Sequence, residues 1–165
     1  MELERVNQKL KETRAELLDI LNHLGNEQLN KQKNAESWTI SQICQHLSIT
    51  EELYVVAIKR GLKSKEESSI ANQPVELLLD RSKRLEAPDI AKPSNEGMER
   101  QAIIDKLYAS RQKLNELLST VEDPTLLNRR HYIHPVFKEL SLMDWLKSLY
   151  IHEQRHIKQI KENID

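Results

Sequence analysis

Residues 141–164 read SLMDWLKSLYIHEQRHIKQIKENI, and this stretch carries the strongest structural signal in the chain. Its core-type positions recur at alternating spacings of three and four residues, the pattern of one helix face packed in a bundle. Ser141, with Asp144 three residues later, is typical of a capped helix N-terminus. The stripe comprises Leu142, Trp145, Leu149, His152, His156 and Gln159. The apolar face of this predicted helix therefore continues into imidazoles.

Three other proline-free segments show the same helical spacing of apolar residues: 2–24, 39–60 and 98–121. The second opens at Thr39 with Gln42 three residues later, a capping box whose side chains satisfy unpaired backbone donors. Gly25 and Gly61 are expected to end the first two helices, and Pro124 stops the third.

Four amphipathic segments of similar length predict an all-α protein, a four-helix bundle built as one domain over residues 1–165. The link over residues 61–97 is long enough for a crossover between the second and third helices, and residues 75–79 are expected to form a short helix within it. Residues 25–38 and 122–140 are expected to be loops. Three glycines and 4% aromatic residues are too few for a β-sandwich or barrel of this length.

The charges of the chain nearly cancel, because 25 basic and 26 acidic side chains give a formal net charge of -1. This balance argues against binding of nucleic acid or of an anionic membrane surface. The single cysteine, Cys44, cannot form an internal disulfide and is expected to be a small buried residue. The lack of a signal-like start and of an apolar run that could span a bilayer predicts a cytoplasmic protein.

Three histidines are candidate metal ligands. His152 and His156 are four residues apart, so on a helix their rings project from one face about one turn apart, as two ligands of one ion require. His46 lies on or beside the core stripe of the second helix and offers a third imidazole. Three imidazoles leave coordination positions open to water or an anionic substrate atom, whereas a closed four-ligand site is usually structural. The alternative is a set of core histidines that are hydrogen-bonded to their neighbours.

Residues 152–156, HEQRH, also match the H-E-x-x-H pattern of zinc metalloproteases, in which the glutamate is the general base. Only nine residues follow His156, which leaves no room for a further downstream ligand, and no strand pattern precedes the helix. A protease is therefore disfavoured. Glu153 is expected to be a solvated carboxylate, or one that supports the ligands, rather than a general base.

The remaining histidines and both tryptophans have simpler interpretations. His131 and His134 are expected to be surface histidines of the loop before the last helix, with His134 alternatively lining a pocket mouth. His23 suits the C-terminal end of the first helix, where its charge would favour the helix dipole. Trp38 is expected to pack at a helix entrance and Trp145 in the core. The sequence assigns no general base and no other catalytic residue.

The chain resembles the DinB-like superfamily, including its YfiT-type metal-dependent hydrolases and bacillithiol S-transferases. The resemblance rests on SWTISQI (37–43) leading to His46-Leu47, on His134-Pro135, and on Leu140-Ser141-Leu142 through Trp145-Leu146 to HEQRH (152–156). It implies a four-helix bundle with a crossover, a divalent metal bound by His46, His152 and His156, and often a homodimer. Lys138 departs from the pattern, because glycine is common at its position in similar sequences.

The expected function is that of a divalent-metal-dependent enzyme acting on a small molecule through an open three-histidine site. Zinc and nickel are the expected ions among those that suit imidazole. Such an ion would activate water for hydrolysis, or would bind a low-molecular-weight thiol cosubstrate for S-transfer. Two alternatives stay open: a noncatalytic metal-stabilised bundle that serves as a stress or binding protein, and a metal-free bundle with hydrogen-bonded histidines.

Overall fold

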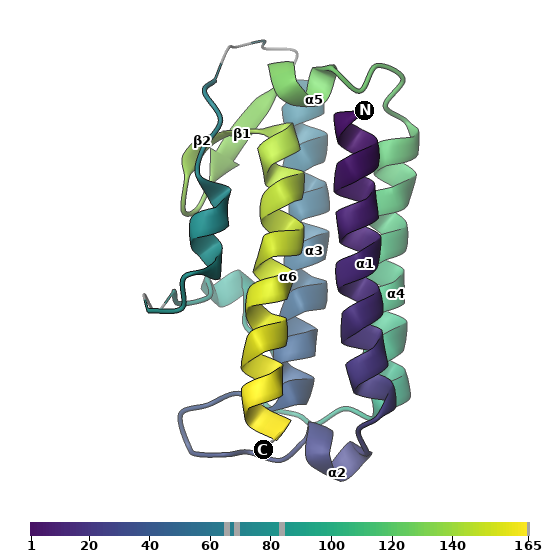
Figure 1. The fold of residues 1–165 in the computed structure, drawn as a ribbon, viewed down its shortest axis with the longest axis vertical. Coiled ribbons are helices and arrows are strands. Elements are labelled where there is room, and N and C mark those ends of the chain that lie inside the picture. The colour runs from purple at the N-terminus through teal and green to yellow at the C-terminus, as the bar shows by residue number, and fades with distance from the viewer. Residues whose placement is uncertain (65–66, 68–69, 83–84, 165) are drawn as a thin grey trace.

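The computed structural model describes residues 1–64, 67, 70–82 and 85–164. Four long helices dominate it and lie side by side along the longest axis of the molecule (Figure 1). They are α1 (Glu2–Asn22), α3 (Ile40–Lys63), α4 (Arg100–Ser119) and α6 (Leu142–Ile164). The predicted four-helix bundle is confirmed. Within the described part of the chain, none of the helices has the length and apolarity needed to cross a bilayer.

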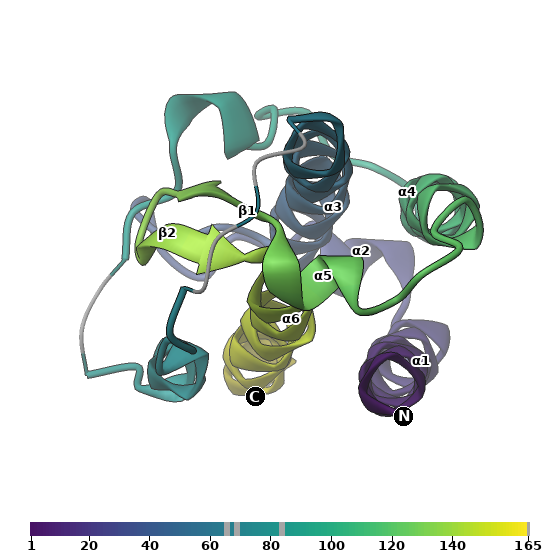
Figure 2. The same ribbon diagram turned by 90° about the horizontal axis from the view of Figure 1, so that it is seen from above.

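The link between α3 and α4 is a crossover, as expected. It descends along the outside of the bundle, so that α3 and α4 point the same way (Figure 1). Within it, the 3₁₀ helix η1 (Val75–Leu79) packs against α6, and the 3₁₀ helix η2 (Asp89–Ala91) packs against α3. The view from above shows the crossover on the side of α3 and α6 that faces away from α1 and α4 (Figure 2). The crossover therefore covers the helix pair that carries the three candidate ligands.

The expected loops contain more structure than the sequence predicts. Short helices α2 (Asn26–Leu29) and α5 (Leu126–Arg129) interrupt them, and a β-hairpin precedes α6. Strands β1 (His131–His134) and β2 (Lys138–Ser141) pair antiparallel, with His131 opposite Ser141 and His134 opposite Lys138. The expectation that no strand precedes the last helix was wrong, because strands of four residues are too short to show an alternating pattern.

Side chains cap both helices that carry the candidate ligands, α3 and α6, at the predicted places. At the start of α3, the Gln42 backbone N–H donates to Thr39 Oγ1 at 3.0 Å, and the Thr39 N–H donates to Gln42 Oε1 at 2.9 Å. This is the full predicted capping box. At the start of α6, the Asp144 N–H donates to Ser141 Oγ at 3.1 Å. Both helices therefore begin where the sequence places their first turns.

Gly61 does not end α3, which continues to Lys63. A Cβ atom at Gly61 would lie 2.5 Å from Leu142 Cδ2 and 3.1 Å from the carbonyl oxygen of His131. The glycine is needed for this close approach of α3 to the hairpin and the start of α6, so its role is tertiary. Helix propensity alone could not reveal it, because a single glycine in a helix costs only about 1 kcal/mol.

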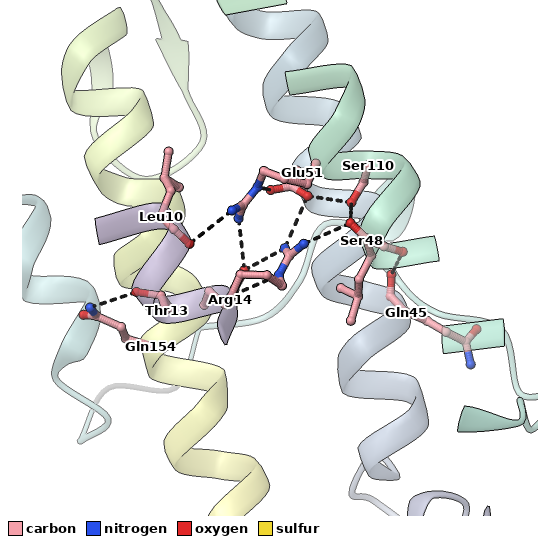
Figure 3. A network of polar contacts seen from close by, with 11 residues as sticks. Leu10, Thr13, Arg14, Gln45, Ser48, Glu51, Ser110 and Gln154 are labelled. Carbon is pink, nitrogen blue, oxygen red and sulfur yellow. Dashed lines mark hydrogen bonds and ion pairs between the residues drawn. The ribbon is translucent and has the colours of Figure 1, made fainter. Parts of the chain in front are cut away.

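A buried ion network connects the four long helices. Arg14 of α1 donates to both carboxylate oxygens of Glu153 on α6, at 2.8 and 3.2 Å, and to Glu51 of α3 at 3.3 Å. Figure 3 shows Arg14 and Glu51 in the middle of this network. Arg111 and Ser110 of α4 complete it by donating to Glu51 at 2.8 and 2.6 Å. Two arginines and two glutamates balance in charge, which makes their burial tolerable.

The hairpin tip yields a stability prediction. Lys138 has a φ of 59°, the only positive φ of a non-glycine residue in the part of the chain that the structure describes. A residue with a Cβ atom costs about 1–2 kcal/mol in this conformation, because Cβ lies too close to a backbone carbonyl oxygen. Glycine avoids this clash, but it loses about 0.5–1 kcal/mol more conformational entropy on folding. Lys138→Gly should therefore raise the free energy of unfolding by about 0.5–1 kcal/mol in a denaturant titration. Lys138→Ala is the control, and a glycine variant no more stable than the alanine variant would contradict the prediction.

Candidate metal centre

The structure brings His46, His152 and His156 together. The Nε2 atom of His152 lies 3.2 Å from Nε2 of His46 and 3.1 Å from Nε2 of His156. One ligand atom of each ring lies within 4.8 Å of the other two. The rings meet edge to face, with centroids 4.6–5.1 Å apart. Helices α3 and α6 thus place one nitrogen of each imidazole at a common point, as the sequence predicts.

The outer nitrogens of two rings have acceptors that fix their protonation. Nδ1 of His46 lies 2.8 Å from the carbonyl oxygen of Ala91, and Nδ1 of His156 lies 2.7 Å from Oε1 of Gln159. An oxygen of this kind only accepts, so each Nδ1 carries the proton of its neutral ring and donates. The Nε2 atoms of His46 and His156 are then unprotonated. His152 Nε2 can carry one proton and direct it fully at only one of them, so at least one Nε2 lone pair of the cluster is left without a donor.

This donor set fits a divalent cation. Two nitrogens bound to one zinc ion at about 2.0–2.1 Å are about 3.3 Å apart at a tetrahedral angle, close to the two observed separations. Burial lowers the pKa of His46, and it lowers that of His156 to about 3 with His46 adding to the effect. Burial and the two neighbouring imidazoles hold the pKa of His152 well below its usual value. All three rings are therefore neutral near pH 7, the form that binds a metal.

The outer nitrogen of the third ring differs from the other two. Nδ1 of His152 is buried and has no hydrogen-bond partner among the residues that the structure describes. Hydrogen bonds among the three rings therefore leave His152 Nδ1 and at least one Nε2 atom unsatisfied. Each unsatisfied buried polar atom costs about 1–3 kcal/mol. The described residues therefore do not satisfy all three histidines by hydrogen bonds alone.

Glu153 is neither solvated nor placed as a general base. Its side chain is 2% exposed, and both of its oxygens accept from Arg14. The expectation of a solvated carboxylate was wrong, because the 100° turn from His152 to Glu153 points the carboxylate into the bundle. Its partner Arg14 lies far from it in sequence, so the local pattern could not show the pairing. In the H-E-x-x-H match, the two histidines therefore belong to the candidate metal cluster, and the glutamate forms a buried ion pair with Arg14.

His134 is buried, with 4% of its surface exposed, so its interpretation as a surface histidine was wrong. Its Nδ1 accepts from the backbone N–H of Val136 at 3.0 Å. Nε2 therefore carries the proton and donates to the Tyr54 hydroxyl at 2.9 Å, which in turn can donate to Ser148 Oγ at 3.0 Å. The neutral ring fixes the hairpin turn to α3 and α6, and its edge lines the cavity described below.

The other singled-out residues lie away from the ligands, except for Trp38. His131 is half-buried beside Glu139, with 3.3 Å between Nε2 and Oε2, and His23 is exposed at the end of α1. Cys44 is buried, as expected, and burial raises the pKa of its thiol to about 12. Trp38 packs against the His46 ring at a centroid distance of 5.1 Å. The position of Trp38 before the capping box predicts that it packs at the start of the helix, but it does not predict the contact with the His46 ring.

Two cavities meet at the histidine cluster. The inner cavity has a volume of about 200 Å³, is mainly apolar and is lined in part by all three histidines. The outer cavity, of about 660 Å³, is lined mainly by polar side chains such as Asn34, Arg81 and Lys92. Trp38 and His156 line both cavities. The cluster thus faces an apolar space on one side and adjoins a polar space on the other.

A crossover four-helix bundle with three convergent imidazoles at a cavity defines the structural class of this protein. The sequence matches the profile of the DinB superfamily over residues 9–160, and the chain belongs to that family. The uncharacterized protein YuaE of Bacillus subtilis (strain 168) is 28% identical to it over 151 residues, which are 92% of each chain.

Two solved structures share the fold. TT2238, a four-helix bundle protein, superposes with a TM-score of 0.67 at 19% identity, over 96% of this chain and 98% of that one. YfiT from Bacillus subtilis superposes with a TM-score of 0.64 at 20% identity, over 97% of this chain and 84% of that one. YfiT is described as a probable metal-dependent hydrolase with an unusual four-helix bundle topology. These likenesses confirm the predicted DinB-like and YfiT-like fold.

The buried state of His134 generates a pH prediction. Burial lowers its pKa to about 4, below the ordinary value of 6.5, so the unfolded chain takes up a proton first as the pH falls. The stabilising contribution of His134 is complete above pH 6.5 and is lost as the pH falls toward 4. One such group changes the free energy of unfolding by up to about 1.4 kcal/mol per pH unit in this window.

The measurement compares urea unfolding of the parent and of His134→Gln from neutral to acid pH, in excess chelator. The parent should be the more stable protein at neutral pH, and its advantage should shrink between pH 6.5 and 4. The other buried histidines titrate in both proteins and largely cancel in the difference. A difference that does not change with pH would show that His134 does not titrate in this way.

Proposed function

We propose that this protein is a divalent-metal-dependent enzyme that transfers a small thiol to an electrophilic small molecule. The observation that carries the proposal is the convergence of three imidazole Nε2 atoms, two of them held unprotonated, at the wall of a cavity. A structural metal has no need of an adjoining cavity, so the arrangement favours catalysis over the noncatalytic metal-stabilised bundle.

In this proposal His46, His152 and His156 bind zinc or nickel. When bound, the ion supplies Lewis acidity, which lowers the pKa of a coordinated thiol or water. The Ala91 carbonyl and the Gln159 side chain orient two of the ligand rings and raise their basicity. Because Ala91 belongs to η2, the crossover takes part in positioning the first ligand.

The transfer step needs no oxidant and no further cofactor. The thiol loses its S–H proton to solvent, and its sulfur donates an electron pair to the electrophilic carbon. A C–S bond forms there while the bond from that carbon to the leaving group breaks, and the leaving group departs with the bonding pair. His134 and Tyr54 line the cavity, but their polar atoms are engaged with one another, with Val136 and with Ser148. They therefore shape and fix the wall rather than accept the proton.

Hydrolysis is the second candidate. The description of YfiT as a probable metal-dependent hydrolase favours it, because YfiT shares the fold. An ion held by the same three imidazoles would activate a water molecule in place of a thiol. The polar outer cavity beside the cluster supports the thiol reaction, since it gives a polar cosubstrate room that a water molecule does not need.

The test uses protein loaded with cobalt or zinc, with cysteine as the thiol. Cysteine should change the visible and near-ultraviolet absorption of the cobalt protein, because a thiolate enters its coordination sphere. With 1-chloro-2,4-dinitrobenzene, zinc protein should consume cysteine at least about tenfold faster than chelated protein, a loss of about 1.4 kcal/mol of transition-state stabilisation on chelation. His152→Ala should abolish the effect, and His131→Ala should retain it.

Each other outcome decides against S-transfer. Metal-dependent hydrolysis of p-nitrophenyl acetate with no response of the cobalt spectrum to cysteine would replace the thiol reaction with hydrolysis. A protein that binds cobalt but shows neither response would be a noncatalytic metal-stabilised bundle.

A further inference from the structure

The lining of the inner cavity is mainly apolar. Leucine, proline, alanine and aromatic side chains make up most of its lining, including Leu53, Leu78 and Trp145. The two charged residues in its lining, Glu86 and Arg155, also line the outer cavity, so they mark the mouth that the two spaces share. A charged ligand group held deep inside would therefore lose its hydration without gaining an ionic partner, which is costly.

Thr50 is a polar residue within this mainly apolar lining. It lies one helical turn after His46 on α3, lines the inner cavity and is 8% exposed. Its hydroxyl is buried and has no hydrogen-bond partner among the residues that the structure describes. Rotation about χ1 exchanges the hydroxyl and the methyl group, and threonine populates both rotamers in helices. A ligand with one hydrogen-bonding group can therefore recover the interaction that the folded protein leaves unmade.

We propose that the inner cavity is the acceptor subsite, and that it takes an uncharged molecule with an apolar body of about one aromatic ring and one hydrogen-bonding group for Thr50. The proposal rests on the proposed function, because it names the electrophilic substrate class of that reaction. The size follows from the volume of about 200 Å³, since an apolar cavity of about 150 Å³ is enough to bind benzene. Thr50 is a positioning residue that orients the acceptor beside the histidine cluster.

The test is binding of benzamide, an uncharged ring with one amide group, by calorimetric titration of chelated and of zinc-loaded protein. The chain has two tryptophans, Trp38 and Trp145, and both line the inner cavity, so occupancy should also change the tryptophan emission. Benzamide should bind saturably to both forms. Benzoate, its charged counterpart, should bind chelated protein at least about tenfold more weakly, because Arg155 lies at the shared mouth, where it donates to the Leu78 and Asp80 carbonyls, and the rest of the lining brings no cationic side chain.

Matched variants locate the binding. Leu53→Trp fills the cavity and should weaken benzamide at least about tenfold, whereas Val56→Trp, on the same helix at a position 45% exposed, should change it less than about twofold. Thr50→Val should weaken benzamide about three- to tenfold, the value of one hydrogen bond, and Thr50→Ser should restore it. Circular dichroism of each variant shows whether it remains folded.

The outcomes separate this proposal from the proposed function. No saturable binding of benzamide, equal affinity for benzoate in chelated protein, or equal effects of Leu53→Trp and Val56→Trp would overturn the acceptor subsite. If cysteine still changes the cobalt spectrum in that case, the proposed function stands. Conversely, benzamide binding in a protein that never takes up metal would remove the reaction and, with it, the acceptor role.

Discussion

Arg14 is the constraint on which the rest of the structure depends. Its guanidinium lies between Glu51 and Glu153 and so ties α1 to α3 and α6, while Arg111 ties α4 to the same carboxylates. Removal of one partner would leave an uncompensated charge in the core, at a cost of about 3–5 kcal/mol. Because Glu153 follows His152 directly and Glu51 lies just over one turn after His46, the network that sets the relative position of α3 and α6 also sets the relative position of the ligands.

The histidine cluster depends on this relative position of α3 and α6. The Nε2 atoms of His46 and His156 lie 3.2 and 3.1 Å from that of His152, so the cluster offers lone pairs in an arrangement that suits a shared cation. The crossover adds the Ala91 carbonyl behind His46, and the hairpin adds His134 and its link to Tyr54. The bundle helices carry the three histidines, whereas residues of the crossover and the hairpin line the cavity beside them. The crossover and the hairpin both lie on the side of α3 and α6 that faces away from α1 and α4 (Figure 2).

The sequence predicts the parts that depend on local periodicity and leaves out those that depend on distant partners. Helical spacing predicts the helices and puts the three histidines on core faces, the length of the link over residues 61–97 predicts the crossover, and Thr39 with Gln42 predicts the capping box. The burial of His134 and the ion pair of Glu153 do not, because Tyr54 and Arg14 lie 80 and 139 residues away in the chain. One signal was available, since Arg14 lies between Leu10 and Leu17 at spacings of four and three. That pattern places a charge on a core face, which requires a buried counter-charge.

The most direct test of the central claim is the metal content of untagged protein, purified without nickel resin and analysed by elemental analysis beside single-histidine variants. We expect near-stoichiometric divalent metal in the parent, its loss in folded His46→Ala, His152→Ala and His156→Ala, and its retention in His23→Ala and His131→Ala. A parent that stays metal-free after loading, or a metal content that the three substitutions do not change, would contradict the metal centre and the function built on it.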